Sequence, residues 1–295
     1  MRIVSLLPSA TEIVYALGLG DCLVARSHEC DFPPDVRTKP VITRSLIPPD
    51  LPSHEIDRMV AETLGTHATL YTLDNALLQQ LKPDLILTQA LCSVCAVPHN
   101  AVLEAVESLR PRPMVLNLEP TTLEEVLNTF KLVAEAAEVF HRGEQLVAHS
   151  RERIEQVRAR TASRPPVRVS FLEWIVPPFA CGHWTPELIA LAGGIDGHGQ
   201  AGQPSRRLAW EEVLHWQPEA IVIACCGFTV ERTLQDLPFL ESQPGWYDLP
   251  ATQQNALYIA DGNAYFSRPG PRLVDSLEWL ANCLSLTGVI PIVQA

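Results

Sequence analysis

Two stretches with the same order of features decide the fold: QQLKPDLILTQALC at residues 79–92 and HWQPEAIVIACC at residues 215–226. Each reads as the end of a helix, a proline, an acidic residue, an apolar run and a cysteine. A short run that is apolar throughout is typical of a parallel strand buried on both faces. A second pair, ATEIVYALGLGD (10–21) and TPELIALAGGID (185–196), repeats in the same way. The sequence therefore predicts two similar α/β halves.

Between these halves the alternation of strands and helices stops. From residue 121 to about residue 161 there is no strand-like run and no proline. Apolar residues recur at nearly helical spacing, and the second half is polar, which is typical of a helix that bridges two bodies. We expect one long helix, or two in series. The predicted fold is α/β, with two Rossmann-like lobes containing parallel sheets: an N-terminal lobe at 1–120, a linker helix at 121–163 and a C-terminal lobe at 164–295.

Composition limits the partners and the compartment. The 295 residues are 47% hydrophobic and 19% charged, which is a soluble globular profile, and the net charge of -12 disfavours nucleic acid as a partner. No apolar run approaches the roughly 20 residues that span a bilayer. Met1 and Arg2 lead directly into a strand-like run, with no secretory signal. We therefore expect a cytoplasmic protein, or a periplasmic one if the sequence is a trimmed mature form.

Candidate ligand contacts follow the predicted strands, because ligands of open parallel sheets bind beyond the carboxyl ends of the strands. Two such lobes facing each other would form a cleft there. Aromatic rings supply stacking area, so we expect a large, flat, partly apolar ligand, which could carry a metal. The candidates are His28, Asp31, Trp174, Phe179, His183, Trp184, Phe228, Asn263, Tyr265, Phe266 and Arg268.

Six of the eight cysteines fall on the same predicted side, and thiolates are good metal ligands. A metal ion or an iron–sulfur cluster could be held by Cys92, Cys95, Cys181, Cys225 and Cys226, with haem or a ferric chelate as a variant. The alternative is plain packing, because cysteine is a common small buried residue. A zinc ribbon is disfavoured because only one CxxC motif is present. A thioredoxin-type role is disfavoured because the next helix begins late, at Pro98.

No catalytic motif is present. The sequence lacks GxSxG, HExxH, the P-loop and GxGxxG. Glu173 ends a predicted strand, where a catalytic carboxylate could lie, but nothing pairs with it at a recognisable spacing. A redox or hydrolytic enzyme that uses Cys92 or Glu173 is the third hypothesis, and we predict that the chain is not an enzyme.

At this point a family resemblance emerges. Five segments of the chain resemble the periplasmic binding proteins for cobalamin and iron-siderophores, the class III type with a helical backbone. These segments are RIVSLLPSATEIVYALGLGD, PDLILTQ, FLEWIVPPFACGHWTPELIALAGGID, LAWEEVLHWQPEAIVIA and ADGNAYFSRPGPRLVDSLEWLA. The cobalamin-binding branch is the more similar one. The matches occur in order over nearly the whole chain.

The resemblance implies a ligand, a partner and contact residues. It implies two lobes on a rigid helix, with cobalamin or a related corrinoid or metal chelate in the interlobe cleft. The matching contact loops include Ser9, His28 to Asp31, Gln89 to Cys95, Trp174 to Trp184, and Asn263 to Arg268. Exported members deliver ligand to an ABC permease through a surface carboxylate on each lobe; Glu104 and either Glu211 or Glu212 are the candidates here. The missing signal and the cysteine-rich loops depart from the pattern and suggest a cytosolic carrier.

Overall fold

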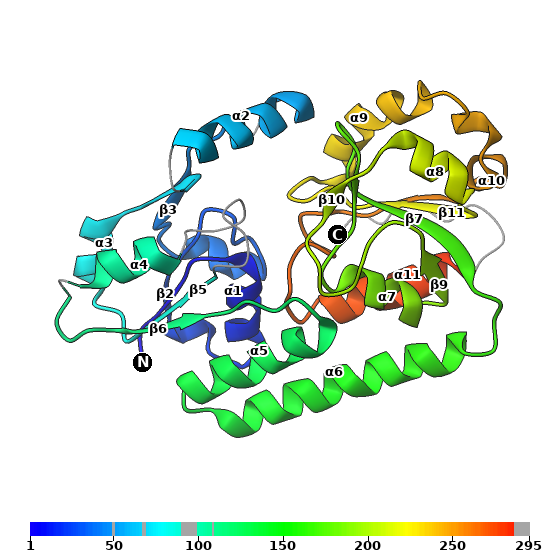
Figure 1. Ribbon diagram of the computed structural model, residues 1–295. Helices are drawn as coiled ribbons and strands as arrows, with labels where there is room; N and C mark the ends of the chain where they lie inside the picture. The colour runs from blue at the N-terminus through cyan, green and yellow to red at the C-terminus, as the bar shows by residue number, and fades with distance from the viewer. Residues whose placement is uncertain (49–50, 67–68, 90–98, 108, 286–295) are drawn as a thin grey trace. The chain divides into compact units, whose positions relative to one another are not determined.

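The computed structural model describes residues 1–48, 51–66, 69–89, 99–107 and 109–285 (Figure 1). The chain divides into two compact units. Unit 1 comprises Met1–Pro120 and Glu124–His149, and unit 2 comprises Thr121–Leu123 and Ser150–Ala295. Two junctions between the units fall inside helices: one between Leu123 and Glu124, in α5 (Leu123–Ala136), and one between His149 and Ser150, in α6 (Phe140–Thr161). No helix in the described part of the chain is both long and apolar enough to cross a membrane.

Unit 1 is built on a four-stranded parallel sheet. The strand order is β2 (Leu23–Arg26), β1 (Ile3–Ser5), β5 (Leu85–Thr88) and β6 (Met114–Asn117). All four residues of β5 are buried, as its continuous apolar run predicts. The helices α1 (Pro8–Ala16), α3 (Asn75–Leu81) and α4 (His99–Val106) flank this sheet (Figure 1).

An excursion from the sheet carries residues 43–73. The strand β3 (Thr43–Ser45) pairs antiparallel with β4 (Tyr71–Leu73), and α2 (Ser53–Thr66) connects them. The strand β4 does not join the parallel sheet of this unit, because it pairs only with β3 among the described residues. A 3-10 turn at Gly20–Cys22 precedes β2, and another at Pro34–Thr38 follows it.

Unit 2 is built around β7 (Val167–Trp174). This strand pairs parallel with β11 (Ala220–Ile223) and β9 (Gly194–Asp196), and antiparallel with β8 (Phe179–Ala180). The sheet is completed by β12 (Leu257–Ile259) beside β11 and β10 (Arg206–Arg207) beside β8. The remaining elements are α7 (Thr185–Leu191), α8 (Trp210–Trp216), α9 (Val230–Glu241), a 3-10 turn (Trp246–Asp248), α10 (Pro250–Gln253) and α11 (Leu273–Cys283).

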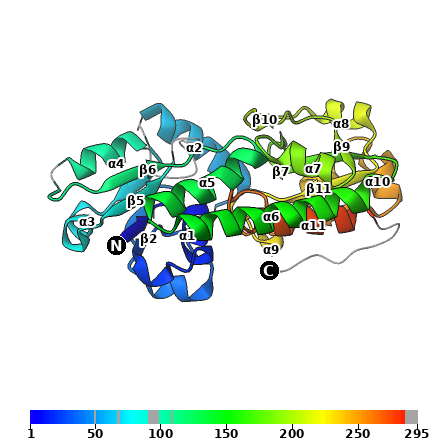
Figure 2. The same ribbon diagram turned by 90° about the horizontal axis from the view of Figure 1, so that it is seen from below.

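Two helices in series, α5 (Leu123–Ala136) and α6 (Phe140–Thr161), occupy the segment for which the sequence predicts a linker. Glu138, with φ of 59°, lies in the break between them. Gly143 permits their close approach, since a Cβ atom there would lie 2.5 Å from the Cβ atom of Ala134. Further along α6, Arg153 forms ion pairs with two acidic residues of α11, and the two helices run side by side (Figure 2).

Candidate functional site

In unit 1, the predicted contact residues follow neighbouring parallel strands. Ser9 is buried in the first turn of α1 after β1, His28 and Asp31 follow β2, and buried Gln89 follows β5. Because β2, β1 and β5 are adjacent and parallel, these residues share one edge of the sheet. Ser9 does not cap α1, because the helix begins at Pro8. Cys92 and Cys95 lie outside the described residues.

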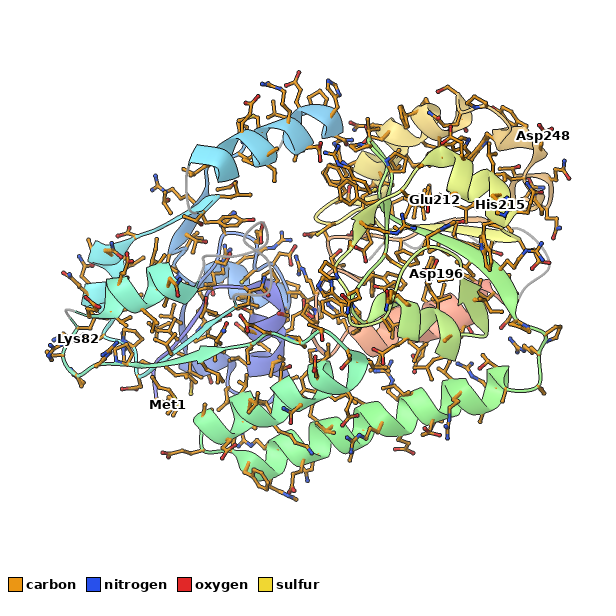
Figure 3. The ribbon with its side chains drawn as sticks, in the orientation of Figure 1. Met1, Lys82, Asp196, Glu212, His215 and Asp248 are labelled. Carbon is orange, nitrogen blue, oxygen red and sulfur yellow. The ribbon has the colours of Figure 1, made fainter. Side chains whose placement is uncertain are left out.

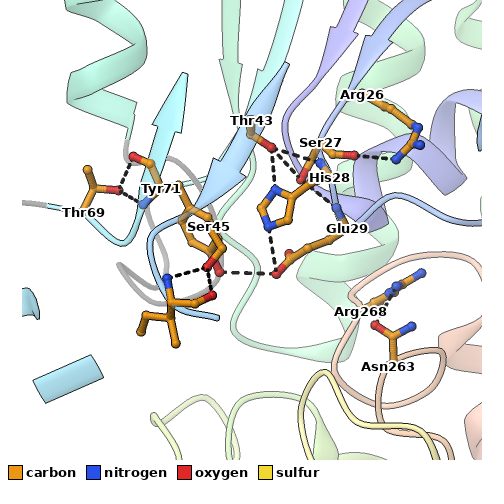
Figure 4. A network of polar contacts seen from close by, with 11 residues as sticks. Arg26, Ser27, His28, Glu29, Thr43, Ser45, Thr69, Tyr71, Asn263 and Arg268 are labelled. Carbon is orange, nitrogen blue, oxygen red and sulfur yellow. Dashed lines mark hydrogen bonds and ion pairs between the residues drawn. The ribbon is translucent and has the colours of Figure 1, made fainter. Parts of the chain in front are cut away.

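His28 lies in a polar network (Figure 4). Its Nδ1 atom is 2.7 Å from Thr43 Oγ1, and its backbone N–H donates to the same oxygen at 3.0 Å. The Thr43 hydroxyl donates to Ser27 Oγ at 3.2 Å. Burial, and then the positive charge of Arg26, lower the pKa of His28, so its imidazole stays neutral at pH 7.

Tyr71 contacts this network, and the sequence did not predict its place there. Its ring centroid lies 5.4 Å from that of His28, and its hydroxyl donates to Glu29 Oε1 at 3.4 Å. The same carboxylate oxygen is 3.9 Å from His28 Nε2. The antiparallel pairing of β3 with β4 brings Tyr71 to His28, and no local sequence pattern indicates that pairing.

In unit 2, aromatic side chains gather at the carboxyl ends of β7 and β11. Trp174 and Phe228 have ring centroids 4.6 Å apart, and the Arg232 guanidinium lies 4.3 Å from the Phe228 centroid. The Phe179 ring, on β8, has the Arg207 guanidinium 5.7 Å from its centroid. Phe228 is buried, whereas Trp174 and Phe179 are half-buried, so the exposed ring surface comes from Trp174 and Phe179.

Trp184 and His183 are held by the backbone around them. Trp184 is buried, and its indole N–H donates to Phe266 O at 2.8 Å, so this residue belongs to the packing of unit 2. His183 has φ of 51°, and its backbone N–H donates to Gln203 O at 2.7 Å. Burial lowers the pKa of the His183 imidazole.

The loop after β12 completes this edge of unit 2. The backbone N–H of Asn263 donates to Phe228 O at 3.0 Å, which ties the loop to the one after β11. Arg268 is buried and donates to Asn263 Oδ1 at 3.0 Å. Tyr265 lies under the Arg272 guanidinium, 5.7 Å from its ring centroid. Aromatic and polar side chains therefore share one edge of the sheet.

Two acidic residues, Glu173 and Asp196, lie at the ends of β7 and β9, and the sequence analysis singled out only Glu173. Glu173 accepts hydrogen bonds from Gly182 N and Thr185 Oγ1, both at 3.4 Å, and from the Ser205 hydroxyl. Burial raises the pKa of Glu173 to about 7, although these hydrogen bonds oppose the shift. Asp196, at the end of β9 (Figure 3), accepts from Gly199 N at 2.5 Å, and burial raises the pKa of Asp196 as well.

The cysteines of the described residues do not form a metal site. Burial raises the pKa of Cys181 and raises that of Cys225 to about 12, so both remain thiols at pH 7. Cys226 is exposed. Nowhere in the described ranges do three His, Cys, Asp or Glu side chains gather as metal ligands would. A metal role for Cys92 and Cys95 stays a prediction from sequence.

Comparison with known proteins places these features in a family. The sequence profile of the periplasmic binding proteins matches residues 3–264. A vitamin B12-binding protein of Vibrio cholerae is 26% identical over 97% of this chain and 89% of its own length. An uncharacterized ABC transporter substrate-binding lipoprotein of Bacillus subtilis is 23% identical over 96% of this chain and 79% of its own length.

Solved structures give the same fold. The periplasmic vitamin B12-binding protein of Vibrio cholerae aligns with a TM-score of 0.70 and 23% identity over 97% of both chains. A periplasmic heme-binding protein from a Roseiflexus species aligns with a TM-score of 0.72 and 23% identity, over 96% of this chain and 97% of that one. The predicted class III fold, with two α/β lobes, is confirmed.

These findings also decide two other predictions. The relatives are substrate-binding proteins and not enzymes, which confirms the prediction of a non-enzyme. The prediction of a cytoplasmic protein is wrong, because the relatives that match almost the whole chain are periplasmic proteins or a lipoprotein. That prediction rested on the residues at the start of the sequence, which do not determine the compartment.

Proposed function

Because this chain belongs to the periplasmic binding protein family, in the group of ABC-importer binding proteins for vitamin B12, heme and siderophores, we propose that it binds cobalamin or a closely related corrinoid. The observation that carries the proposal is the match of almost the whole chain to a vitamin B12-binding protein.

The aromatic surface of unit 2 suits this ligand. A corrin ring is broad and largely apolar on its faces, and it carries amide side chains at its rim. Trp174 and Phe179, both half-buried, supply ring surface at the carboxyl edge of the sheet, and buried Phe228 packs against Trp174. Asn263 and Tyr265, on the neighbouring loop, supply polar groups at which rim amides would form hydrogen bonds.

The same proposal assigns the importer contacts. Glu212 accepts two hydrogen bonds from the Arg206 guanidinium, at 3.1 and 2.7 Å, and one from Ala209 N at 3.0 Å. The hydrogen bonds from Arg206 lower the pKa of Glu212 to about 2. Glu211, on the same helix, is exposed, as is Glu104 on α4. We therefore assign Glu104 and Glu211, and not Glu212, as the carboxylates that meet the permease.

Calorimetric titration with aquocobalamin tests the proposal. We expect saturable one-to-one binding, weakened about tenfold or more by Trp174→Ala, since loss of a large aromatic contact costs about 1.4 kcal/mol or more. Phe140→Ala is the matched control, because Phe140 is an exposed aromatic side chain on α6. Absence of heat with the native protein, or equal loss of affinity in both variants, would contradict the proposal.

The alternative from sequence, a metal or iron–sulfur protein that uses cysteines, has no supporting observation in the described part of the chain. Haem is the competing cargo to include in the titration, because it is also a flat macrocycle around a metal. Stronger binding of haem than of aquocobalamin would replace the corrinoid by haem in the proposal.

A further inference from the structure

We propose that Arg232 positions Trp174 for stacking against the cargo, by way of the Phe228 ring, which contacts both. Arg232 acts through these two rings, so it is a positioning residue. This inference rests on the proposed corrinoid cargo, and it identifies a residue that sets how tightly Trp174 binds it. All the residues that carry the inference belong to unit 2, on β7, α9 and the loop after β11.

The first link is the contact between Trp174 and Phe228. Their ring centroids are 4.6 Å apart, and their ring planes are inclined by 42°. Trp174 is half-buried, so part of its indole can meet a ligand, whereas Phe228 is buried. The indole N–H donates to Val176 O at 2.9 Å, which holds one edge of the indole. The rest of the indole is restrained by packing, and Phe228 contributes to that packing.

The second link is the contact between Phe228 and Arg232. The backbone of Phe228 is held on both sides, because its N–H donates to Cys225 O and its carbonyl accepts from Asn263 N, each at 3.0 Å. The direction of the ring therefore depends on its side-chain torsions and on the groups packed against it. The Arg232 guanidinium carbon lies 4.3 Å from the ring centroid, a distance at which the cation is attracted to the aromatic face.

The third link is the ion pair that holds Arg232. Its Nη1 atom is 3.0 Å from Asp236 Oδ2, and the two side chains are 19% and 15% exposed. Arg232 lies in the first turn of α9, where its backbone N–H donates to the hydroxyl of the N-cap residue Thr229. A cation there faces the positive end of the helix dipole, and an acid four residues after a base is the weaker order for such a pair. Helix stability therefore does not account for this arginine, whereas its contact with Phe228 does.

These contacts fix Trp174 before the ligand arrives. Without the guanidinium, the Phe228 ring gains side-chain freedom, and Trp174 loses part of the packing that restrains it. Immobilising the indole would then cost free energy on binding, because a side chain that is already ordered loses less entropy. Loss of Arg232 should therefore weaken binding only where Trp174 is present to stack on the ligand.

Calorimetric titration with aquocobalamin of four full-length proteins tests this dependence. They are the native chain, Arg232→Met, Trp174→Ala and the double variant. Methionine keeps an unbranched side chain and removes the charge. Arg232→Met should weaken binding about fivefold when Trp174 is present and should leave the affinity unchanged in the Trp174→Ala background. Arg158→Met is the matched control, because it also breaks an ion pair within one helix, with Glu155 on α6, and it should not change the affinity.

Near-ultraviolet circular dichroism measures the positioning without a ligand, since it reports aromatic rings held in a fixed environment. The Trp174 signal is the difference between spectra recorded with Trp174 and with Trp174→Ala. This difference should shrink in Arg232→Met, while the far-ultraviolet spectrum is retained. If Arg232→Met does not fold, Asp236→Asn replaces it in both experiments, because it releases the guanidinium from its ion pair and should act in the same direction.

The outcomes separate this inference from the proposed function. An unchanged affinity in Arg232→Met, or equal losses with and without Trp174, overturns the role of Arg232 and leaves the cargo standing. A Trp174→Ala variant that binds aquocobalamin as tightly as the native protein also overturns it. A native protein that binds no aquocobalamin refutes the proposed function, and an unchanged Trp174 signal in Arg232→Met then overturns the inference as well.

Discussion

Replacing Glu173 with glutamine is expected to change how stability depends on pH. Burial raises the pKa of this carboxyl from 4.5 to about 7 in the folded protein. The folded protein is therefore most stable below pH 4.5, where this carboxyl group is protonated in both the folded and the unfolded state. The stability falls as the pH rises to about 7, because the unfolded chain releases the proton more readily. At about 1.4 kcal/mol per pKa unit, the loss approaches about 3 kcal/mol as an upper limit.

Glutamine can keep the hydrogen bonds. Its carbonyl oxygen can accept from Gly182 and Thr185, as Glu173 Oε1 does, and its amide group can donate to Ser205 once that hydroxyl reverses its role. The free energy of unfolding of Glu173→Gln, relative to that of the native protein, should therefore increase between pH 4.5 and 8. The glutamine cannot ionise, so it does not carry the cost of a buried charge.

Urea unfolding at a series of pH values measures this difference directly. The control is Glu211→Gln, which removes an exposed carboxyl group from α8 and therefore no buried charge. A flat difference for Glu173→Gln would show that the carboxyl is not held in a desolvated site, and the reasoning would be refuted.

Two further predictions concern packing. Arg153→Ala removes the ion pairs between α6 and α11 and should lower the free energy of unfolding by about 1–2 kcal/mol. The control Arg158→Ala breaks an exposed ion pair and should lower it by less than about 0.5 kcal/mol. Equal losses of unfolding free energy in the two variants would contradict this prediction. Gly143→Ala should lower the free energy of unfolding by about 1–3 kcal/mol, because the new Cβ atom would clash with Ala134. Gly65→Ala places its Cβ atom in open space on α2 and should raise the free energy of unfolding by up to about 1 kcal/mol. An increase in both variants would refute the close contact between α5 and α6.

The parts of the fold that follow from sequence are those fixed by local pattern. The apolar run after Pro83 gave a strand buried on both faces, and the similar run after Pro218 gave β11. The absence of strands and prolines between residues 121 and 161 gave two helices in series. Such features depend on neighbouring residues, so they can be read from spacing.

The parts that were missed depend on distant contacts. β8, β9 and β10 have two or three residues each, too few for a periodic pattern. The contact of His28 with Tyr71 joins residues 43 positions apart in sequence, and it requires the antiparallel pairing of β3 with β4. The hydrogen bond between Ser205 and Glu173 likewise depends on a loop returning across β7.

The predicted site residues divide in a similar way. Trp174 and Phe228 are in contact, as their positions after adjacent strands lead one to expect. Trp184 also follows a strand, but its side chain is buried and donates a hydrogen bond to Phe266 O, so it packs inside unit 2. Position after a strand indicates the edge of the sheet, but the direction of a side chain depends on local backbone geometry, such as the positive φ of His183.

The central claim is corrinoid binding, and co-elution tests it most directly. The protein is mixed with aquocobalamin and passed through a desalting column, and the visible spectrum of the protein fraction is recorded. The account predicts that the colour travels with the protein at one corrinoid per chain. A colourless protein fraction, with the corrinoid recovered entirely in the small-molecule volume, would contradict it.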